Sequence, residues 1–262
     1  MKIGFLGAGA MGGALLDGAV NNQLVKAKDV YVYDISPVIQ EKYQKKGANV
    51  LDSARDLAVK SDLVFLAVKP QFAKDAIAEF EGELKGKAVI SVMAGKTNAI
   101  LREMLGEDVR ILRVMPNIPA LVGAGCFALC DENTLKPEER EFADKLFKSM
   151  GTVEWLSEEL VDVAAGFTGA IPAFTAMFIE GLTQGAVLEG IPWVKAYDMA
   201  TQAVLGSAEL LSKTKMHPAQ LKDMVCSPKG ATIEGIRALE HGDFKADCME
   251  AIIATYEKAK KL

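Results

Sequence analysis

Histidine and cysteine are scarce in this sequence. Its 262 residues include two histidines and four cysteines. The cysteines form no Cys-x-x-Cys pair, and neither histidine stands at a zinc-ligand spacing from them. We therefore expect no metal site and no disulfide framework, and we interpret the cysteines as reduced thiols of a cytoplasmic protein.

Long runs of one charge are also missing. The 30 Lys and Arg residues are interspersed with 35 Asp and Glu residues, for a net charge of -5. Nucleic-acid-binding proteins concentrate basic residues on one face, so we expect no nucleic-acid partner. One uncharged stretch, residues 163–179, is shorter than the roughly 20 residues of a membrane span and contains glycine and proline. We interpret it as a helix buried in a core or a subunit interface, and we expect no membrane contact.

Apolar runs typical of strands alternate with helical stretches in the first part of the chain. The predicted strands cover residues 2–6, 30–34, 63–68, 88–93, 109–115, 126–130 and 152–156. The predicted helices between them cover residues 10–22, 36–46, 53–60, 71–81, 97–104 and 137–150. This alternation indicates an α/β domain in which helices cover both faces of a parallel sheet.

The strand pattern stops after Trp155. Helices are predicted over residues 157–189, 192–213, 217–225, 231–241 and 243–260. We therefore expect two domains: an α/β domain at 1–155 and an all-helical domain at 156–262.

A glycine-rich turn joins the first strand to the first helix. It reads Gly7-Ala8-Gly9-Ala10-Met11-Gly12. In such a turn Gly7 permits the sharp bend, Gly9 lets a pyrophosphate approach the backbone, and Gly12 allows close helix packing. The free N–H groups at the helix start then face the phosphates. In this context the pattern predicts a Rossmann-type domain that binds NADH or NADPH.

Asp34 ends the second predicted strand, 22 residues after Gly12. An acidic side chain at this point can accept hydrogen bonds from the adenosine ribose, and it would repel a 2′-phosphate. Asp34 therefore favours NADH. In the alternative interpretation, Asp34 only caps the helix that begins near Ser36, and both cofactors can be used.

Side chains suited to acid–base catalysis are scarce. Dehydrogenases of 3-hydroxyacids with this kind of first turn use a lysine on the first long interdomain helix, but no lysine lies between Asp162 and Glu180. Reduction of a cyclic imine needs less help, because the imine nitrogen is basic enough to arrive largely protonated near neutral pH. The protein then mainly has to orient the imine carbon against the nicotinamide.

Five stretches of the chain resemble the pyrroline-5-carboxylate reductase family, in the order of that family. They are residues 5–15, 63–71, 91–97, 113–125 and 217–236. The resemblance implies reduction of 1-pyrroline-5-carboxylate to L-proline, the last step of proline synthesis. It also implies an N-terminal Rossmann-like domain and a C-terminal helical domain that interleaves with a partner's to form a homodimer, in some cases assembled further into a homodecamer.

The resemblance also implies site residues in the late loop. Substrate would bind Ser227, Gly230, Ala231 and Thr232. Its carboxylate would meet the N–H groups before the next helix, and the catalytic residue, Thr232, would place its hydroxyl beside the ring nitrogen. The alternative is a plain helix cap by Ser227 or Thr232.

Strand ends supply the remaining implied site residues. Met115 and Pro116 would contact substrate where it meets the nicotinamide. The implied cofactor contacts outside the glycine turn and Asp34 are Ala67, Val68, Lys69, Pro70, Ala94, Gly95 and Asn117. Lys69 alternatively is only a solvated charge.

Three residues depart from the family's usual pattern. Lys229 stands where the family usually has glycine, Ile171 stands in a turn that usually has glycine there, and Met224 stands where asparagine is common. Two alternatives therefore stay open: a reductase for a related cyclic imino acid, and a catalytically silent regulatory protein that binds a dinucleotide.

Overall fold

The computed structural model describes residues 1–259; residues 260–262, where the last predicted helix and the second predicted domain end, lie outside the described part. The described chain divides into two compact units, residues 1–169 with residues 258–259, and residues 170–257. This division lies inside a long helix, whereas the boundary predicted near residue 155 marks the end of the strands. The domain boundary therefore stays a prediction.

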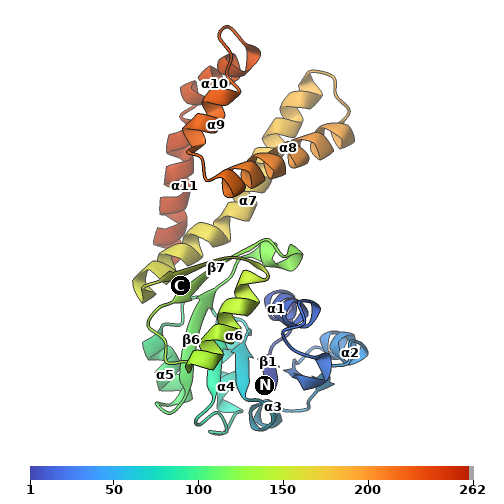
Figure 1. Cartoon of the computed structure of the whole chain (residues 1–262), viewed down its shortest axis with the longest axis vertical. Helices are drawn as coiled ribbons and strands as arrows, with labels where there is room; N and C mark the ends of the chain where they lie inside the picture. Colours follow the sequence, from blue (N-terminus) through green and yellow to red (C-terminus); the bar gives the residue numbers. More distant parts are fainter. Residues whose placement is uncertain (260–262) are drawn as a thin grey trace. The chain divides into compact units, whose positions relative to one another are not determined.

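Within residues 1–259, eight strands form one sheet in the order β3-β2-β1-β4-β5-β6-β7-β8. Figure 1 labels β1, β6 and β7 of this sheet. Their bounds are β1 Ile3–Leu6, β2 Val30–Tyr33, β3 Asn49–Val50, β4 Leu63–Leu66, β5 Ala88–Ser91, β6 Arg110–Met115, β7 Gly125–Cys130 and β8 Gly151–Leu156. All seven predicted strands are present. The short edge strand β3 was not predicted.

The sheet is parallel from β3 to β6, and β7 runs antiparallel to β6. Only the short 3-10 helix η3 (Ile118–Val122) separates these two strands. A parallel connection needs a crossover of about a dozen residues or more, so β7 has to return beside β6. After the helix α6 (Pro137–Lys148), β8 pairs with β7 in parallel.

Helices cover both faces of this sheet, as predicted. Their bounds are α1 Ala10–Asn21, α2 Pro37–Lys45, α3 Ala54–Lys60, α4 Ala73–Ala78, α5 Asn98–Leu105 and α6 as above. One core cluster contains buried residues of α1, α2 and α6, and a second contains those of α3, α4 and α5. Alternate residues of the central strands belong to the two clusters, because successive side chains of a strand point to opposite faces. Phe5 and Leu6 show this alternation.

An ion pair fastens α6 to the sheet. Arg110 of β6 donates Nε to Oε2 of Glu139 at 2.9 Å and Nη2 to Oε1 at 2.6 Å. Burial raises the pKa of Glu139, but the hydrogen bonds from Arg110 and from the Lys136 N–H outweigh burial and hold the pKa below its usual 4.5.

The helices after β8 are α7 Glu158–Leu188, α8 Trp193–Thr214, α9 Pro218–Met224, α10 Ala231–His241 and α11 Phe244–Ala259. All five were predicted, with ends within about two residues. By length and composition, α7 is apolar enough to cross a membrane, and 22% of its most apolar window is buried. Between residues 170 and 257 only Thr183 and Ala196 are buried.

Candidate functional site

Most of the predicted cofactor residues meet at one edge of the sheet. The parallel strands β2, β1, β4, β5 and β6 are neighbours, so their carboxyl ends lie side by side. Asp34, Gly7, Ala67 and Pro116 directly follow the ends of β2, β1, β4 and β6, and Ala94 lies three residues after the end of β5. In open α/β sheets, ligands bind in the crevice outside these strand ends.

The glycine turn has the shape that a dinucleotide phosphate requires. Gly7 has φ +85°, a backbone conformation that side-chain-bearing residues rarely adopt. A Cβ at Gly12 would collide with the carbonyl oxygen of Gly7, whereas a Cβ at Gly9 would meet open space. Gly9 is the N-cap of α1 and supplies no side-chain cap, so N–H groups of the first turn remain available to a phosphate. The residues present therefore fit a bound pyrophosphate.

Asp34 braces the glycine turn from the end of β2. Its Oδ2 accepts a hydrogen bond from the Ala8 N–H at 2.8 Å, and its Oδ1 accepts one from the Ser36 N–H at 2.9 Å. Ser36 is itself the N-cap residue of α2, and its side chain forms no cap. Each carboxylate oxygen of Asp34 can accept a further bond, so the contact with Ser36 is compatible with a ribose contact.

The carboxyl ends of β4 and β5 lie on the opposite side of β1 from Asp34. A Cβ at Gly7 would lie only 2.9 Å from the Ala67 carbonyl oxygen, so the two turns are in close contact. Lys69 is exposed, and within the described residues no carboxylate lies within ion-pair distance of it. Gly95 is exposed and has φ +69°. These positions are open to a ligand.

The end of β6 is more enclosed. Met115 and Asn117 are buried, with 4% and 8% of their surface exposed, and Pro116 between them is half-buried. Oδ1 of Asn117 accepts a hydrogen bond from the Cys126 N–H at 2.8 Å, and Nδ2 donates to the Thr168 carbonyl at 3.2 Å.

Arg113 of β6 was not predicted as a site residue. It is fully buried, and its Nη1 and Nη2 donate to Glu158 and Asp162 at 2.6 Å each. These carboxylates lie four residues apart on one face of α7, so Arg113 ties the first turns of that helix to β6. An arginine inside an apolar strand, with an acidic i, i+4 pair downstream, was the sequence signal for this contact.

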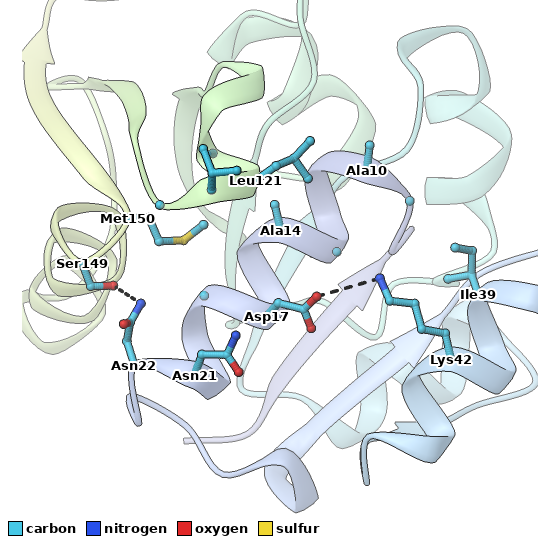
Figure 2. A pocket seen from close by; sticks show the side chains of 16 residues that line it. Ala10, Ala14, Asp17, Asn21, Asn22, Ile39, Lys42, Leu121, Ser149 and Met150 are labelled. Atoms are coloured by element: carbon cyan, nitrogen blue, oxygen red, sulfur yellow. Dashed lines mark hydrogen bonds and ion pairs between the residues drawn. The ribbon is translucent and has the colours of Figure 1, made fainter. Parts of the chain in front are cut away.

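A cavity of about 530 Å³ extends from the glycine turn along the outer face of α1 (Figure 2). Asp17 and Lys42 form an ion pair there, and the Asn22 amide donates to the Ser149 hydroxyl. Of the predicted site residues, only Gly9 and Ala10 line it. The cavity therefore adjoins the phosphate end of the predicted site rather than the strand ends.

The predicted substrate loop, residues 227–232, belongs to the second unit. The Gly230 N–H donates to the Ser227 carbonyl at 3.0 Å, and a Cβ at Gly230 would collide with the Ser227 hydroxyl. Gly230 is the N-cap of α10 and supplies no side-chain cap. Neither Ser227 nor Thr232 caps this helix, so the plain-cap alternative is wrong. The exposed Thr232 hydroxyl has no hydrogen-bond partner among residues 1–259.

The three departures from the family pattern lie at exposed positions. Lys229 has φ +60°, a left-handed conformation that favours glycine. Ile171 is 37% exposed and Met224 is 70% exposed.

Family models match both parts of the chain. Residues 158–262 match the model described as pyrroline-5-carboxylate reductase dimerisation. Residues 2–95 match the model described as NADP oxidoreductase, coenzyme F420-dependent.

Curated relatives match over the full length. The pyrroline-5-carboxylate reductase of Escherichia coli is 40% identical over 263 aligned positions, which cover 100% of this chain and 98% of that protein. The enzyme of Methanosarcina acetivorans is 37% identical and covers 100% of this chain and 97% of its own length.

Solved structures agree. The crystal structure of Plasmodium falciparum pyrroline carboxylate reductase with NADP bound is 32% identical, covers 100% of this chain and 97% of that one, and superposes with a TM-score of 0.89. The Coxiella burnetii pyrroline-5-carboxylate reductase is 30% identical, covers 99% and 97%, and has a TM-score of 0.92.

Proposed function

The chain belongs to the pyrroline-5-carboxylate reductase family, and from this premise we propose how its residues carry out the reaction. It is an oxidoreductase that reduces 1-pyrroline-5-carboxylate to L-proline with a nicotinamide dinucleotide. When bound, the dinucleotide supplies the hydride that the imine carbon accepts. The chain's own residues would hold and orient the two reactants.

The glycine turn would hold the dinucleotide by its pyrophosphate, through the free N–H groups after Gly9. Residues 67–70 and 94–95 would line its path along the strand ends. We favour NADH over NADPH, because the Asp34 carboxylate would face a 2′-phosphate with like charge.

The loop at residues 227–232 would hold the substrate carboxylate at the uncapped start of α10. The Thr232 hydroxyl would accept a hydrogen bond from the protonated ring nitrogen and so orient the ring for hydride transfer. Met115 and Pro116 would form the wall against which the ring lies. The ring nitrogen arrives with its proton, so no side chain has to donate one.

The second unit would form a homodimer, and possible assembly to a decamer follows the family pattern. The exposed apolar residues of α7 and α8 support this proposal, because an uncovered apolar surface of this extent marks an interface. We propose a cytoplasmic enzyme without nucleic-acid or membrane partners, in which α7 is covered by a second copy rather than by lipid.

The observation that carries the reaction is the meeting of the glycine turn with four neighbouring strand ends, in a chain related to these reductases over its full length. The test is nicotinamide absorbance during incubation with pyrroline-5-carboxylate and either cofactor. We expect faster consumption of NADH. Preference for NADPH would contradict the role given to Asp34, and dinucleotide binding without turnover would support the silent regulatory protein. Turnover of another cyclic imino acid alone would redirect the substrate assignment.

Thr232→Val tests the catalytic assignment. Removal of one hydrogen bond to a charged group should lower kcat/KM about tenfold to a hundredfold. Thr232→Ser should restore most of it, and Thr152→Val, an exposed threonine of β8, is the matched control. Equal kcat/KM for Thr232→Val and the control would remove Thr232 from the site.

A further inference from the structure

A proline inside α7 leaves one carbonyl of that helix without its usual donor. Pro172 lies within the helix, which runs from Glu158 to Leu188. In an α-helix each carbonyl accepts from the N–H four residues later, and proline has no N–H. The carbonyl deprived by Pro172 is therefore that of Thr168. Thr168 is 8% exposed, so water has little access to its carbonyl.

Asn117 supplies the missing donor. Its Nδ2 lies 3.2 Å from this same Thr168 carbonyl oxygen, and the bond is buried. The amide orientation is determined by its two partners, because the Cys126 N–H needs an acceptor and the Thr168 carbonyl needs a donor. One asparagine thus joins the end of β6 to the start of β7 and to α7.

We propose that Asn117 and Pro172 act as a pair: the proline frees a helix carbonyl, and the asparagine uses it to position the Met115–Pro116 strand end. Asn117 is then a positioning residue. Its side chain holds protein atoms, and this revises its expected role as a direct cofactor contact. The catalytic part of the inference rests on the proposed function, which places Met115 and Pro116 beside the reacting atoms.

A double-mutant cycle tests the pairing on protein without ligand. Asn117→Ala leaves the buried Thr168 carbonyl and the part-buried Cys126 N–H without this partner, and the midpoint of thermal unfolding should fall by about 4 °C or more. Pro172→Ala returns an N–H to the helix, so in that background Asn117→Ala should cost about half as much or less. Equal shifts in both backgrounds would overturn the pairing.

Asn117→Asp provides an independent test if Pro172→Ala folds poorly. The aspartate keeps an acceptor for Cys126 but places an oxygen against the Thr168 carbonyl. It should lower the unfolding midpoint further than Asn117→Ala does. A wild-type midpoint for Asn117→Asp would show that the Thr168 contact is of no consequence, and would overturn the proposal.

Kinetics separate positioning from a merely structural role. Asn117→Ala should lower kcat about tenfold at saturating reactants, while the Kd of the dinucleotide, measured by fluorescence titration, changes less than about twofold. Asn133→Ala is the control, since the Asn133 side chain also bridges backbone groups: it donates to the Cys130 and Asp131 carbonyls and accepts from the Leu135 N–H, in the turn after β7. It should lower stability and leave kcat unchanged.

Two kinetic results would contradict the proposal. A tenfold loss of dinucleotide affinity with unchanged stability would make Asn117 a direct ligand. An unchanged kcat in the folded variant would make it structural only. Absence of pyrroline-5-carboxylate turnover by the wild type would instead count against the proposed function, and the unfolding cycle would still decide the pairing.

Discussion

The two compact units differ in where their apolar side chains lie. In the first unit, core clusters on both faces of the sheet contain most of the apolar residues of strands and helices. In the second unit, two residues are buried, and large apolar side chains of α7 and α8 are exposed, including Met177, Val194 and Met199. The first unit has a core of its own, whereas the second has to complete its core with another surface.

The exposed apolar surface of the second unit explains why α7 has the length and composition of a membrane span. A helix that is apolar all round is buried in a core, in an interface or in lipid. The match of residues 158–262 to a dimerisation family identifies the interface as the surface to test first.

The largest expected effect comes from a charge on this exposed apolar surface. Met177 of α7 is 74% exposed, and Met177→Glu would bury a carboxylate in the proposed interface. We expect the dimer to dissociate, with a dissociation constant raised at least about a hundredfold. Analytical ultracentrifugation measures it. Val59→Glu on α3, a 53% exposed position of the first unit, is the control and should leave association unchanged. Equal association of both variants would refute an interface at Met177.

A smaller effect, confined to the first unit, should follow from Glu139→Ala. Removal of this carboxylate leaves the Arg110 guanidinium, which is 20% exposed, without its charged partner and costs about 2 kcal/mol of unfolding free energy. Denaturant titration measures the loss. Glu141→Ala, on the same helix, breaks an exposed i, i+4 pair with Lys145 and should cost under about 0.5 kcal/mol. Similar losses in both variants would show that the Arg110 pair contributes no more than a surface contact.

The same carboxylate makes the first unit sensitive to acid. The pKa of Glu139 is lower in the folded protein than its usual 4.5, so its contribution to stability is present above pH 4.5 and is lost as the pH falls through the folded value. Glu139→Gln should therefore lose less stability than the wild type as the pH falls below 4.5. Parallel stability curves for the two proteins would contradict this origin.

The smallest effect should come from Lys229. Glycine accepts its φ of +60° without strain, so Lys229→Gly should gain up to about 1 kcal/mol, reduced by the larger entropy of unfolded glycine. Lys215→Gly, at φ 55° after α8, is the matched control for strain outside the substrate loop. Differential scanning calorimetry compares the two. A loss of stability in Lys229→Gly alone would mean that the lysine makes a stabilising contact. A KM change in Lys229→Gly alone would show that its ammonium helps to hold the substrate carboxylate.

The sequence predicted the strands and helices well, because each element has its own periodicity of apolar residues, which can be recognised within that segment alone. The edge strand β3 was not predicted, because its two residues, Asn49 and Val50, form no apolar run. The antiparallel turn of β7 depends on the absence of a crossover helix after β6. The short connection predicts an antiparallel strand only if β7 is already known to pair with β6.

The site was predictable where one short segment carries it, as in the glycine turn. It was not predictable where distant residues share a bond. Nothing within residues 113–125 indicates that Asn117 reaches a carbonyl 51 positions later in the chain. The position of Arg113 inside an apolar strand indicates that it needs acidic partners, but not that these are Glu158 and Asp162. Such contacts depend on tertiary packing, which periodicity does not encode.

The brace formed by Asp34 has a consequence for the speed of binding. Its two oxygens hold the Ala8 and Ser36 N–H groups, and so preorganise the backbone that would receive the phosphates. The conformational entropy of that turn is lost when the chain folds, not when it meets its ligand. Association should then require no slow rearrangement of this turn, and diffusion and orientation alone would limit its rate.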